Sequence, residues 1–395
     1  MTTEPLTLPP TIEDGGDKLL AWLREMRDEQ PVWRDEHGIW HVFRYADVEE
    51  ILSDFALFSS DTSRLLPAAQ TLAEGSLISM DPPQHRKLRR LISHAFTPKV
   101  VAGLAPRIGE VTNQLLDATG GAQEWDIVDE LAYPLPVIVI AELLGLPTSD
   151  RALFRAWADQ LFEMDFEDPN DPDLMPKVEA AMADMRAYLL EACLDRRAHP
   201  REDLISKLAT AEVDGERLTD NEVVGFSTLL LIAGHITTTA LLGNTVLCLD
   251  EQPAALAELR ADRSLVPGAL EEVLRYRSPF PQLGRVTMRE AELSGTVVPP
   301  DVFVAPWILS ANRDERAFAD PDRFDIHREH NHQVAFGKGI HFCLGAPLAR
   351  LEAKIALNIL LDRYAEIHLQ PGAHLDFYRN GVFASRSVPI AVSHA

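Results

Sequence analysis

The stretch from Val223 to Leu249 carries no formal charge and constrains the fold more than any other part of the chain. Thr219 and Glu222 lie ahead of it at the three-residue spacing of a capping box, which starts a helix. The sequence Asp250 to Pro253 ends the pattern, since proline cannot continue a helix. The predicted helix has about 30 residues and is roughly 45 Å long at 1.5 Å per residue. It must therefore span a bilayer or run buried through a large protein.

Polar residues inside this stretch favour the buried helix over a membrane span. Gly234, His235 and Asn244 interrupt the apolar run, and the flanking residues are acidic where a membrane protein would place basic ones. The N-terminal residues are polar and rich in proline, with neither an apolar signal core nor an anchor. We therefore expect a protein that is not attached to a membrane.

Helical periodicity dominates the rest of the chain, and strand signals are few and short. Nothing in the sequence marks a domain boundary, so we expect one mainly α domain with small β-sheets. The predicted helices are Asp17–Glu29, Ala46–Ser53, Gln84–Ala95, Val101–Thr119, Leu131–Leu144, Arg151–Phe162 and Pro176–Arg197, and the predicted strands are Ile39–Phe43, Val302–Ala305 and Val382–Val392.

The charge balance and the cysteine content exclude several classes of partner. Lys and Arg number 37 and Asp and Glu number 61, giving a net charge of −24. Such an acidic chain is not expected to bind nucleic acid or an anionic membrane. The cysteines are Cys193, Cys248 and Cys343, and such a sparse, odd set fits a reducing cytoplasm. We expect the first two to be core residues.

The residues from Phe336 to Gly345 read FGKGIHFCLG and place Cys343 after a glycine-rich turn. Gly337 and Gly339 permit the positive backbone angles of a tight loop, and Pro347 suits the first turn of a helix. The unpaired N–H groups at that helix start favour a thiolate, which is a soft metal ligand. A single sulfur indicates haem iron more than zinc, although a buried structural cysteine has the same local pattern.

The pattern Phe336-x-x-Gly339-x-His341-x-Cys343-x-Gly345 resembles the haem-binding signature of the cytochrome P-450 family. The resemblance covers nearly the whole chain and is to the soluble bacterial branch of that family. It implies the cytochrome P-450 fold as a single domain over residues 1–395. It also implies haem b as the cofactor, with Cys343 as the axial thiolate ligand. Phe336, Gly337, His341 and Gly345 would surround the haem.

Membership of this family would make the protein a haem-thiolate monooxygenase. Such an enzyme activates O2 with two electrons and inserts one oxygen atom into a hydrophobic small-molecule substrate, by hydroxylation or epoxidation. Electron donation by the thiolate favours cleavage of the O–O bond. No flavin or iron–sulfur segment is recognisable in the sequence. We therefore expect the electrons to come from a ferredoxin and its ferredoxin reductase.

In the long helix, Ala233 to Thr238 resembles the family's oxygen-binding segment. Gly234 costs helix stability, and threonine hydroxyls can bond back to the preceding turn and bend a helix. The resemblance implies that Thr237 hydrogen-bonds the bound oxygen and helps to deliver protons, with His235 and Thr238 beside it. The family usually has an acid before that threonine, and Ile236 cannot carry a proton. We expect water or a substrate hydroxyl to assist, in preference to His235 or to inefficient O–O cleavage with leakage of peroxide.

Two further groups of residues match family motifs. Glu272 and Arg275 share one helix face and match the Glu-x-x-Arg motif, which together with Arg323 would brace the cysteine loop through a buried network. An ordinary surface ion pair has the same spacing. His85 and Arg89, on one face of a predicted helix, match residues that bind the haem propionates, as do Arg285 and His341. The basic residues around His85 would also suit an acidic electron-transfer partner.

The resemblance also implies which residues line the substrate pocket. They are mostly apolar, as is usual in ligand pockets, and this indicates a hydrophobic product of bacterial secondary metabolism, first a macrolide or other polyketide and second a terpenoid or steroid. The predicted pocket residues are Leu65, Leu66, Leu77, Phe162, Leu229, Ala233, Phe280, Leu283, Val382 and Phe383.

Three other functions stay open at this point. A peroxide-using haem-thiolate peroxygenase would also lack an acid at position 236. A haem protein without enzymatic activity would bind substrates and never turn them over. A zinc protein could use the histidine-rich stretch from His327 to Cys343, but zinc would leave the match of Glu272 and Arg275 unexplained.

Overall fold

A computed structural model describes residues 8–65, 75–95, 97–162, 173–213, 215–379 and 381–394. Helices form most of this structure, as the periodicity predicts. The α-helices are α1 (Asp17–Glu29), α2 (Tyr45–Ser53), α4 (Gln84–Ala95), α5 (Pro98–Gly103), α6 (Ala105–Ala118), α7 (Pro134–Leu144), α8 (Arg151–Phe162), α9 (Leu174–Ala198), α10 (Leu204–Thr210), α11 (Asp220–Glu251), α12 (Pro253–Ala261), α13 (Val266–Tyr276), α14 (Ile308–Ala311) and α15 (Ala346–Arg363).

The long uncharged stretch forms α11, which runs through the centre of the helical part. The side chain of Thr219 accepts a hydrogen bond from the Glu222 N–H, and the Glu222 carboxylate accepts one from the Thr219 N–H, so the predicted capping box is present. Helices α7, α9, α13 and α15 pack against α11. It is the one helix of the described residues that is long and apolar enough to cross a membrane, and 72% of its most apolar window is buried inside the protein. It is therefore a core helix.

Two small sheets complete the fold. The larger has the strand order β1-β2-β10-β7-β3, in which only β2 and β10 are parallel, and the second has the order β11-β12-β4. Hairpins β5–β6 and β8–β9 stand apart. The strands are β1 (Val32–Arg34), β2 (Trp40–Val42), β3 (Phe58–Ser59), β4 (Glu124–Asp126), β5 (Glu212–Val213), β6 (Glu216–Arg217), β7 (Arg285–Thr287), β8 (Ala291–Leu293), β9 (Thr296–Val298), β10 (Phe303–Pro306), β11 (Tyr364–Leu369) and β12 (Pro389–His394).

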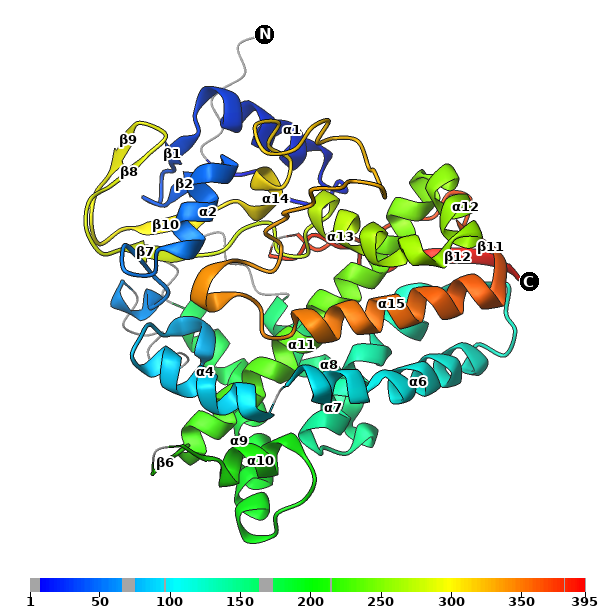
Figure 1. Cartoon of the computed structure of the whole chain (residues 1–395), viewed down its shortest axis with the longest axis horizontal. Helices are drawn as coiled ribbons and strands as arrows, with labels where there is room; N and C mark the ends of the chain where they lie inside the picture. Colours follow the sequence, from blue (N-terminus) through cyan, green and yellow to red (C-terminus); the bar gives the residue numbers. More distant parts are fainter. Residues whose placement is uncertain are drawn as a thin grey trace.

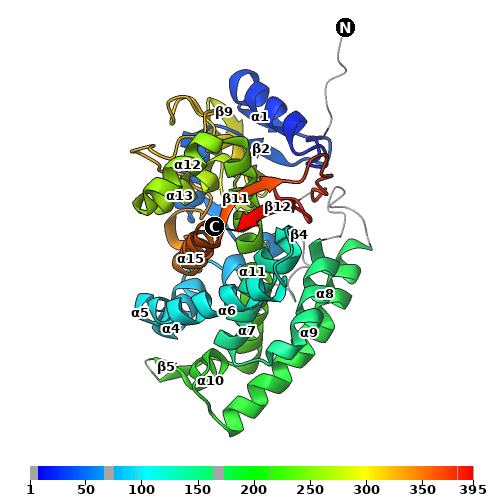
Figure 2. The same cartoon turned by 90° about the vertical axis from the view of Figure 1, so that its right-hand side faces the viewer.

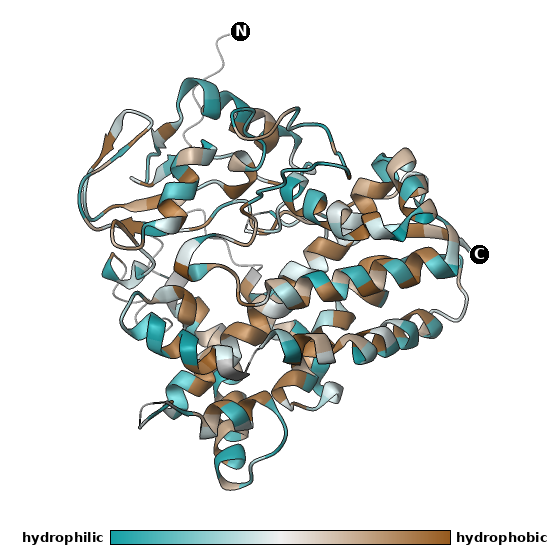
Figure 3. Cartoon of the chain, in the orientation of Figure 1, coloured by the Kyte–Doolittle hydropathy of each residue, from teal (hydrophilic) through white to brown (hydrophobic). Residues whose placement is uncertain are grey.

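Figure 1 shows the larger sheet with α1 and α2 at the upper left, most of the other helices to the right and below, and β11 and β12 near the C-terminus at the right. Helix α15 crosses the middle of this view, and it packs against α11. Seen from the side, α8 and α9 lie next to each other along one edge (Figure 2). The ribbon of α15 alternates between hydrophilic and hydrophobic residues (Figure 3), as expected for a helix with one buried face.

Three predicted elements differ from the structure. The predicted helix Leu131–Leu144 is an α-helix only from Pro134 onward, as α7, because a π-helical turn over Val128–Ala132 precedes it. The predicted helix Val101–Thr119 is divided into α5 and α6 at Leu104. The cause is Pro106, which lacks an N–H and starts a new helix instead of continuing the old one. The predicted strand Val382–Val392 forms only from Pro389 onward. In the part before it, the Ser385 hydroxyl donates to the Ser387 carbonyl and closes a local turn that competes with strand pairing.

The capping box of α11 leads to a stability prediction. Replacing Thr219 by alanine removes the hydroxyl that accepts the Glu222 N–H, and we expect a loss of about 1 kcal/mol in the free energy of unfolding. Urea unfolding followed by circular dichroism measures this loss. Thr210→Ala is the control, because the Thr210 hydroxyl donates to the Ser206 carbonyl within its own helix and caps no helix terminus. Equal effects of the two substitutions would contradict the prediction.

Candidate active site

The cysteine loop folds as a tight turn that leads into α15. Gly337 and Gly339 have φ angles of 68° and 67°, which are unfavourable for other residues. At Gly339 a Cβ would also lie 2.9 Å from the carbonyl oxygen of Leu52, so the loop packs directly on α2. The Cys343 N–H donates to the Phe336 carbonyl at 2.9 Å and closes the turn. The predicted placement of Cys343 just ahead of a helix N-terminus agrees with this geometry.

Burial and nearby positive groups have opposite effects on the pKa of the Cys343 thiol. Burial raises the pKa of the Cys343 thiol, while the backbone N–H groups of Gly345 and Ala346 and the cations Arg89 and Arg350 lower it. Burial is the larger effect, so the helix terminus alone does not produce a thiolate. A bound metal cation would add the missing positive charge, since coordination deprotonates a thiol.

Glu272 and Arg275 form a buried ion pair on α13. Their side chains are both 0% exposed and joined by two hydrogen bonds of 2.8 Å. The remaining Arg275 hydrogen bonds go to the backbone carbonyls of Asn312, Pro321 and Arg323. Isolated buried charges are costly, and this set of bonds compensates both of them. The pair therefore holds the long irregular segment that precedes the cysteine loop.

The predicted third member of this network, Arg323, is wrong as a side-chain contact. The Arg323 side chain is exposed, and the residue contributes only its backbone carbonyl. The guanidinium that reaches Glu272 belongs to Arg328, at 3.1 Å from Oε2. Asn331 and the N–H of Asp325 also donate to the Glu272 carboxylate. Sequence reasoning missed Arg328 because the residues around it lack the periodicity that would show which side chains point inward.

The four predicted propionate-binding residues lie together beside the cysteine loop. His85 and Arg89 lie on α4 as predicted, and the ring centroids of His85 and His341 are 4.3 Å apart. Burial, together with Arg285, His85 and Arg89, lowers the pKa of His341 to about 3. Burial also lowers the pKa of Arg285 to about 10. His85 and Arg89 on α4, Arg285 on β7 and His341 in the cysteine loop therefore form one cluster of positive or protonatable side chains, although the three segments are far apart in the sequence.

Thr237, Ala233 and Leu229 lie four residues apart and share one partly exposed face of α11. The Thr237 hydroxyl donates to the Ala233 carbonyl at 2.8 Å, which is the predicted back-bond. Thr238 is buried and makes the same kind of bond to Gly234 at 3.4 Å. The helix is nevertheless unbroken through this segment, so the structure has no opened turn here.

His235 and Gly234 face the other packed helices. His235 lies more than half a turn from Thr237, donates from Nδ1 to the Leu231 carbonyl at 2.7 Å and contacts the Tyr133 ring edge-on. Burial lowers the pKa of His235 to about 4, so its side chain is neutral at physiological pH. At Gly234, a Cβ would lie 2.8 Å from Ile140 Cδ1, so this glycine allows α7 and α11 to approach closely.

Ile236 belongs to a small apolar cluster at 1% exposure. The cluster also contains Ala240, Tyr378, Val382 and Ala384, with the predicted pocket residue Phe280 packed against it. Position 236 is therefore surrounded mainly by apolar side chains, and the cluster holds no carboxylic acid in place of the missing one; its one proton-carrying group is the Tyr378 hydroxyl. Val382 and Phe280 are thus brought together from two distant segments, as the sequence predicts.

Other predicted pocket residues lie elsewhere. Phe383 is 1% exposed and packs in the core around α1, where its ring closely approaches Gly16, so the prediction that it lines the pocket is wrong. Leu77 belongs to the main core, and Leu283 packs on the core beneath the larger sheet. Leu65 is partly buried after a short 3-10 turn. Leu66 and the side chain of Phe162 lie outside the described residues.

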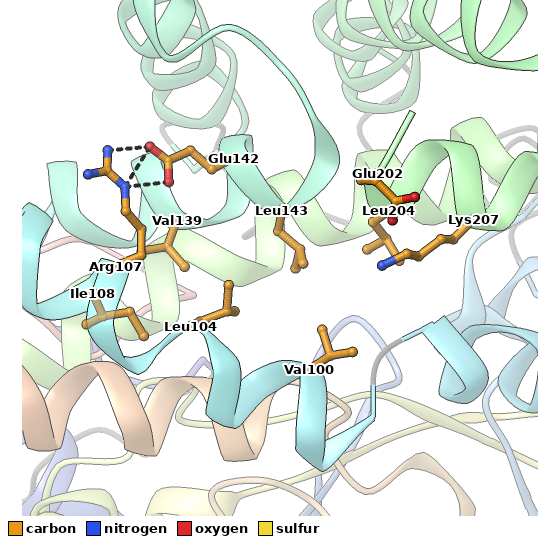
Figure 4. Close-up of a pocket in the computed structure, with 10 residues that line it drawn as sticks. All are labelled: Val100, Leu104, Arg107, Ile108, Val139, Glu142, Leu143, Glu202, Leu204 and Lys207. Carbon is orange, nitrogen blue, oxygen red and sulfur yellow. Dashed lines mark hydrogen bonds and ion pairs between the residues drawn. The ribbon is translucent and has the colours of Figure 1, made fainter. Parts of the chain in front are cut away.

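A cavity of about 300 Å³ between α5, α6, α7 and α10 contains none of the predicted pocket residues (Figure 4). Its lining joins apolar side chains such as Leu104 and Val139 to a bidentate ion pair between Arg107 and Glu142. Neither the cysteine loop nor the Thr237 face of α11 contributes to it. It is therefore separate from the candidate active site.

Comparison with known proteins decides the family. The sequence model of the family described as "Cytochrome P450" matches residues 22–393. This chain belongs to the cytochrome P450 family. The match spans nearly the whole chain and includes the cysteine loop, α4, α11 and α13.

Named relatives of this P450 are bacterial hydroxylases and epoxidases. Erythromycin C-12 hydroxylase of Saccharopolyspora erythraea is 48% identical over 94% of this chain and 94% of its own. Cyclomarin C epoxidase CymV of Salinispora arenicola is 46% identical over 98% and 99% of the two chains. A mutant of P450 EryK in complex with erythromycin B superposes with a TM-score of 0.93 at 46% identity, over 97% of this chain and 98% of that one. The protein is therefore a haem-thiolate monooxygenase with the predicted mainly α fold.

The residues present fit a haem with two propionates. Nε2 of His85 and Nε2 of His341 are buried without a hydrogen-bond partner. Within the ranges that the structure describes, neither Arg89 nor Arg285 forms an ion pair with a carboxylate. Buried polar groups without partners are rare, and here they converge on a site where the Asp81 carboxylate acts on His85 and Arg285 without forming an ion pair with Arg285 within the described residues. A dianionic group beside the Cys343 sulfur would compensate all four.

The zinc alternative is wrong on both geometry and family. Within the described parts of the chain, no three His, Cys, Asp or Glu side chains cluster closely enough to hold a metal ion. The histidines of the predicted stretch point to different neighbours: His327 pairs with Glu258, His332 stacks on Phe318 and His341 contacts His85.

The network of Glu272, Arg275 and Arg328 predicts that substitutions of Arg328 and of Arg323 have different effects on stability and haem content. Arg328→Ala removes a guanidinium from the buried Glu272 carboxylate, and we expect a loss of about 3 kcal/mol in the free energy of unfolding and a lower haem content. Arg323→Ala is the matched control and leaves both values unchanged, because its side chain is exposed. The ratio of haem to protein absorbance and urea unfolding measure the two effects. The reverse order of effects would refute the network described here.

Proposed function

We propose that Cys343 is the thiolate ligand of haem b in this P450 and that His85, Arg89, Arg285 and His341 bind its propionates. This proposal rests on the position of these four side chains beside Cys343: each carries a positive charge or a ring nitrogen without a hydrogen-bond partner. Among the described residues, Cys343 is the one cysteine that precedes a helix N-terminus. When bound, the haem supplies the redox chemistry that activates O2. Phe336, Gly337 and Gly345 shape the loop, and Arg350 stacks over the Phe336 ring at 4.5 Å.

Thr237 is the residue proposed to hold and orient a proton donor at the reacting oxygen. Its hydroxyl lies on the partly exposed face of α11 and is held by the Ala233 carbonyl. The neutral ring of His235 lies on another face, and Ile236 is apolar. Protons must therefore reach Thr237 through ordered water or a substrate hydroxyl. Thr238 and Gly234 act through helix packing in this proposal.

The proposed substrate is a hydrophobic macrolide or other polyketide, oxidised as a late step of secondary metabolism. Two supports are a relative named for hydroxylation of erythromycin and a structural neighbour bound to erythromycin B. The apolar residues Leu229, Ala233, Phe280 and Val382 fit such a molecule. A steroid is the second candidate, because a neighbour at 40% identity was solved with testosterone. Spin-state titration with erythromycin-type macrolides and with steroids distinguishes the two classes.

The proposed electron donors are a ferredoxin and its reductase, and the proposed compartment is the cytoplasm. Arg86 and Arg90 are exposed on α4, next to the predicted propionate residues of the same helix. Phe342, directly before Cys343, is 40% exposed. A small acidic partner could dock on this basic and apolar face close to the haem ligand. Faster reduction by an acidic ferredoxin at low salt than at high salt tests this docking.

A peroxygenase is a second candidate function, favoured by the apolar surroundings of position 236. Such an enzyme uses hydrogen peroxide in place of O2 and electrons, so no protons need to be drawn from solvent, because the peroxide brings both of them. Product formation with peroxide alone at the rate obtained with the reductase system would support the peroxygenase. A much slower peroxide reaction would support the monooxygenase with external electron donors.

The ligand proposal predicts the effect of changing each cysteine. Cys343→Ser removes the soft sulfur ligand, and we expect complete loss of the thiolate-type carbon monoxide difference band of the reduced protein. Cys193→Ser and Cys248→Ser are the controls and should retain it, because both side chains are buried core residues. Retention of the band in the Cys343 variant would exclude this residue as the ligand.

The proton-delivery proposal predicts the effect of restoring an acid at position 236. Ile236→Glu should raise the fraction of electrons that appear as product and lower peroxide release, because a carboxylic acid can carry protons. Ile236→Gln is the matched control, since it has the same size and polarity without the acid. Product and peroxide are measured per reduced nicotinamide consumed. If Glu and Gln had the same effect, the missing acid would not limit proton delivery.

A further inference from the structure

Three buried polar groups without hydrogen-bond partners lie beside one face of α11. They are the Nε2 atom of His235, the hydroxyl of Thr239 and the hydroxyl of Tyr133, and none of them has a partner among the described residues. His235 and Thr239 are four residues apart and so share one helix face. The Tyr133 and His235 rings meet edge-on, with their centroids 5.2 Å apart. Buried groups of this kind are normally hydrogen-bonded, often to ordered water, so the three mark a site that can hold water.

The hydrogen bond of His235 determines which of its ring nitrogens is free to accept. Nδ1 lies 2.7 Å from the Leu231 carbonyl oxygen, and a carbonyl can only accept, so Nδ1 carries the ring proton. Burial lowers the pKa of His235 to about 4 and keeps the ring neutral. Nε2 is therefore a bare acceptor. A water molecule that donates one hydrogen to Nε2 has its other hydrogen free for a neighbouring hydroxyl.

A π-helical turn places Tyr133 beside α11. The turn covers Val128–Ala132, and the Tyr133 N–H donates to the Val128 carbonyl, five residues earlier, at 2.9 Å. Such turns are rare and are often found at functional sites. Helix α11 packs against this one, and at Gly243 a Cβ would lie 3.7 Å from Val128 Cγ2. Tyr133, the N-cap residue of α7, is therefore fixed against α11.

Tyr133 also lines a surface cavity of about 310 Å³ between α6, α7 and α8. The guanidinium carbon of Arg155 lies 4.4 Å from the centre of the Tyr133 ring. Arg155 also pairs with Asp129 at 3.0 Å, and the two side chains are 44% and 51% exposed. Solvent and a carboxylate that exchanges protons with it therefore lie beside Tyr133, which separates this cavity from the buried polar site.

Packing alone does not account for the Tyr133 hydroxyl. A phenylalanine ring would make the same edge-on contact with His235 and the same contact with Arg155. Burying a hydroxyl without a hydrogen bond costs stability that phenylalanine would avoid. A water molecule as partner removes this cost.

A second buried tyrosine, Tyr378, lies near Tyr133. Tyr378 is 6% exposed and belongs to the apolar cluster that contains Ile236. Burial raises the pKa of Tyr133, and negative charge on Asp159 or Tyr378 raises it further. The two tyrosines are therefore near enough for their charges to interact.

The geometry of α11 orders these contacts around the helix. At about 100° per residue, the side chains on this side of α11 follow one another in the order His235, Thr239, Ile236, Ala240 and Thr237. Tyr133 contacts the first of them, and Tyr378 lies in the cluster of Ile236 and Ala240. Tyr378 therefore covers the sector between the buried polar site and the Thr237 face. A proton cannot pass through the unbroken helix, so it has to travel around it past Tyr378.

We propose that ordered water held by Tyr133 and Tyr378 carries protons from the surface cavity around α11 to the Thr237 hydroxyl. This inference rests on the role proposed above for Thr237. Each tyrosine hydroxyl passes its own proton toward Thr237 and takes up one from the water on its cavity side, so neither residue gains or loses charge. His235 fixes the water beside Tyr133 by accepting a hydrogen bond at Nε2. The route supplies the protons that an acid would supply at position 236.

The test follows proton transfer in the haem-loaded full chain without substrate. The oxygenated ferrous protein is frozen, reduced by one electron with γ-rays and warmed in steps. Electron paramagnetic resonance then shows the temperature at which the bound oxygen takes up a proton. We expect Tyr133→Phe and Tyr378→Phe each to raise this temperature, because phenylalanine has no hydroxyl to pass a proton on. Tyr188→Phe is the matched control and should leave it unchanged, because the Tyr188 hydroxyl bonds Asp150 at 2.7 Å, away from α11.

A double variant separates proton transfer from a structural effect of losing the hydroxyl. Adding Ile236→Glu to Tyr378→Phe places an acid beside the gap, and we expect it to restore the transfer temperature of the unchanged protein. A structural defect would not be restored in this way. Failure of the acid to restore transfer would therefore count against the route.

A crystal structure of the haem-loaded chain gives a readout that does not depend on activity. We expect an ordered water molecule bonded to both the Tyr133 hydroxyl and Nε2 of His235, and its displacement in Tyr133→Phe. A site without water, or an unchanged transfer temperature in either tyrosine variant, would overturn the proposal.

Thr237→Ala distinguishes failure of this route from failure of the function proposed for Thr237. If Thr237→Ala raises the transfer temperature and the tyrosine variants do not, the role of Thr237 stands and the route is wrong. If Thr237→Ala has no effect, the role of Thr237 is wrong and the route that ends at its hydroxyl falls with it.

Discussion

The buried pair of Glu272 and Arg275 is the interaction on which the rest of the site depends. The Glu272 carboxylate and the Arg275 guanidinium gather backbone and side-chain groups from residues 312–331, a segment with little regular structure that leads directly to the cysteine loop. Such a segment has no helix or sheet to satisfy its carbonyls. The Glu272–Arg275 ion pair supplies hydrogen bonds to this backbone instead. It thereby fixes the segment that leads to the cysteine loop without any contribution from a cofactor. Because both charges are fully buried, removing either partner would leave the other uncompensated.

The two sides of the proposed haem site are built by opposite physical means. On the cysteine side, charged side chains and polar groups without hydrogen-bond partners lie close together. A ligand that brings negative charge and a metal ion would compensate these buried groups and so stabilise the site. On the other side, α11 presents Thr237 in apolar surroundings that include Ile236. A cofactor fixed on the polar side would therefore have its other face in a region of low polarity. There the supply of protons is limited by the solvent and the substrate that enter.

Sequence reasoning succeeded where local chemistry determines structure. The capping box at Thr219, the glycine turn before Cys343 and the helix spacing of His85 and Arg89 are all present. It failed where long-range packing decides between similar candidates. Arg323 and Arg328 both lie in the same irregular segment, and only the fold brings one of them to Glu272. Phe383 follows Val382, but its ring enters the core around α1 instead. The break at Leu104 was readable from Pro106, because proline rarely continues a helix.

The close approach of Gly339 to Leu52 has a consequence for the order in which the protein matures. The carbonyl of Leu52 and the backbone of Ser53 occupy the space where any side chain at 339 would lie, and Lys338 pairs with Glu49, which lies 289 residues earlier in the chain. The cysteine loop can dock only after the two ends of the chain have met, which is a contact of high sequence separation and therefore slow to form. Uptake of the cofactor should accordingly be a late event in biogenesis. Free haem would then bind to a chain that has already completed its long-range folding. The haem would therefore have little contact with an incompletely folded cysteine loop.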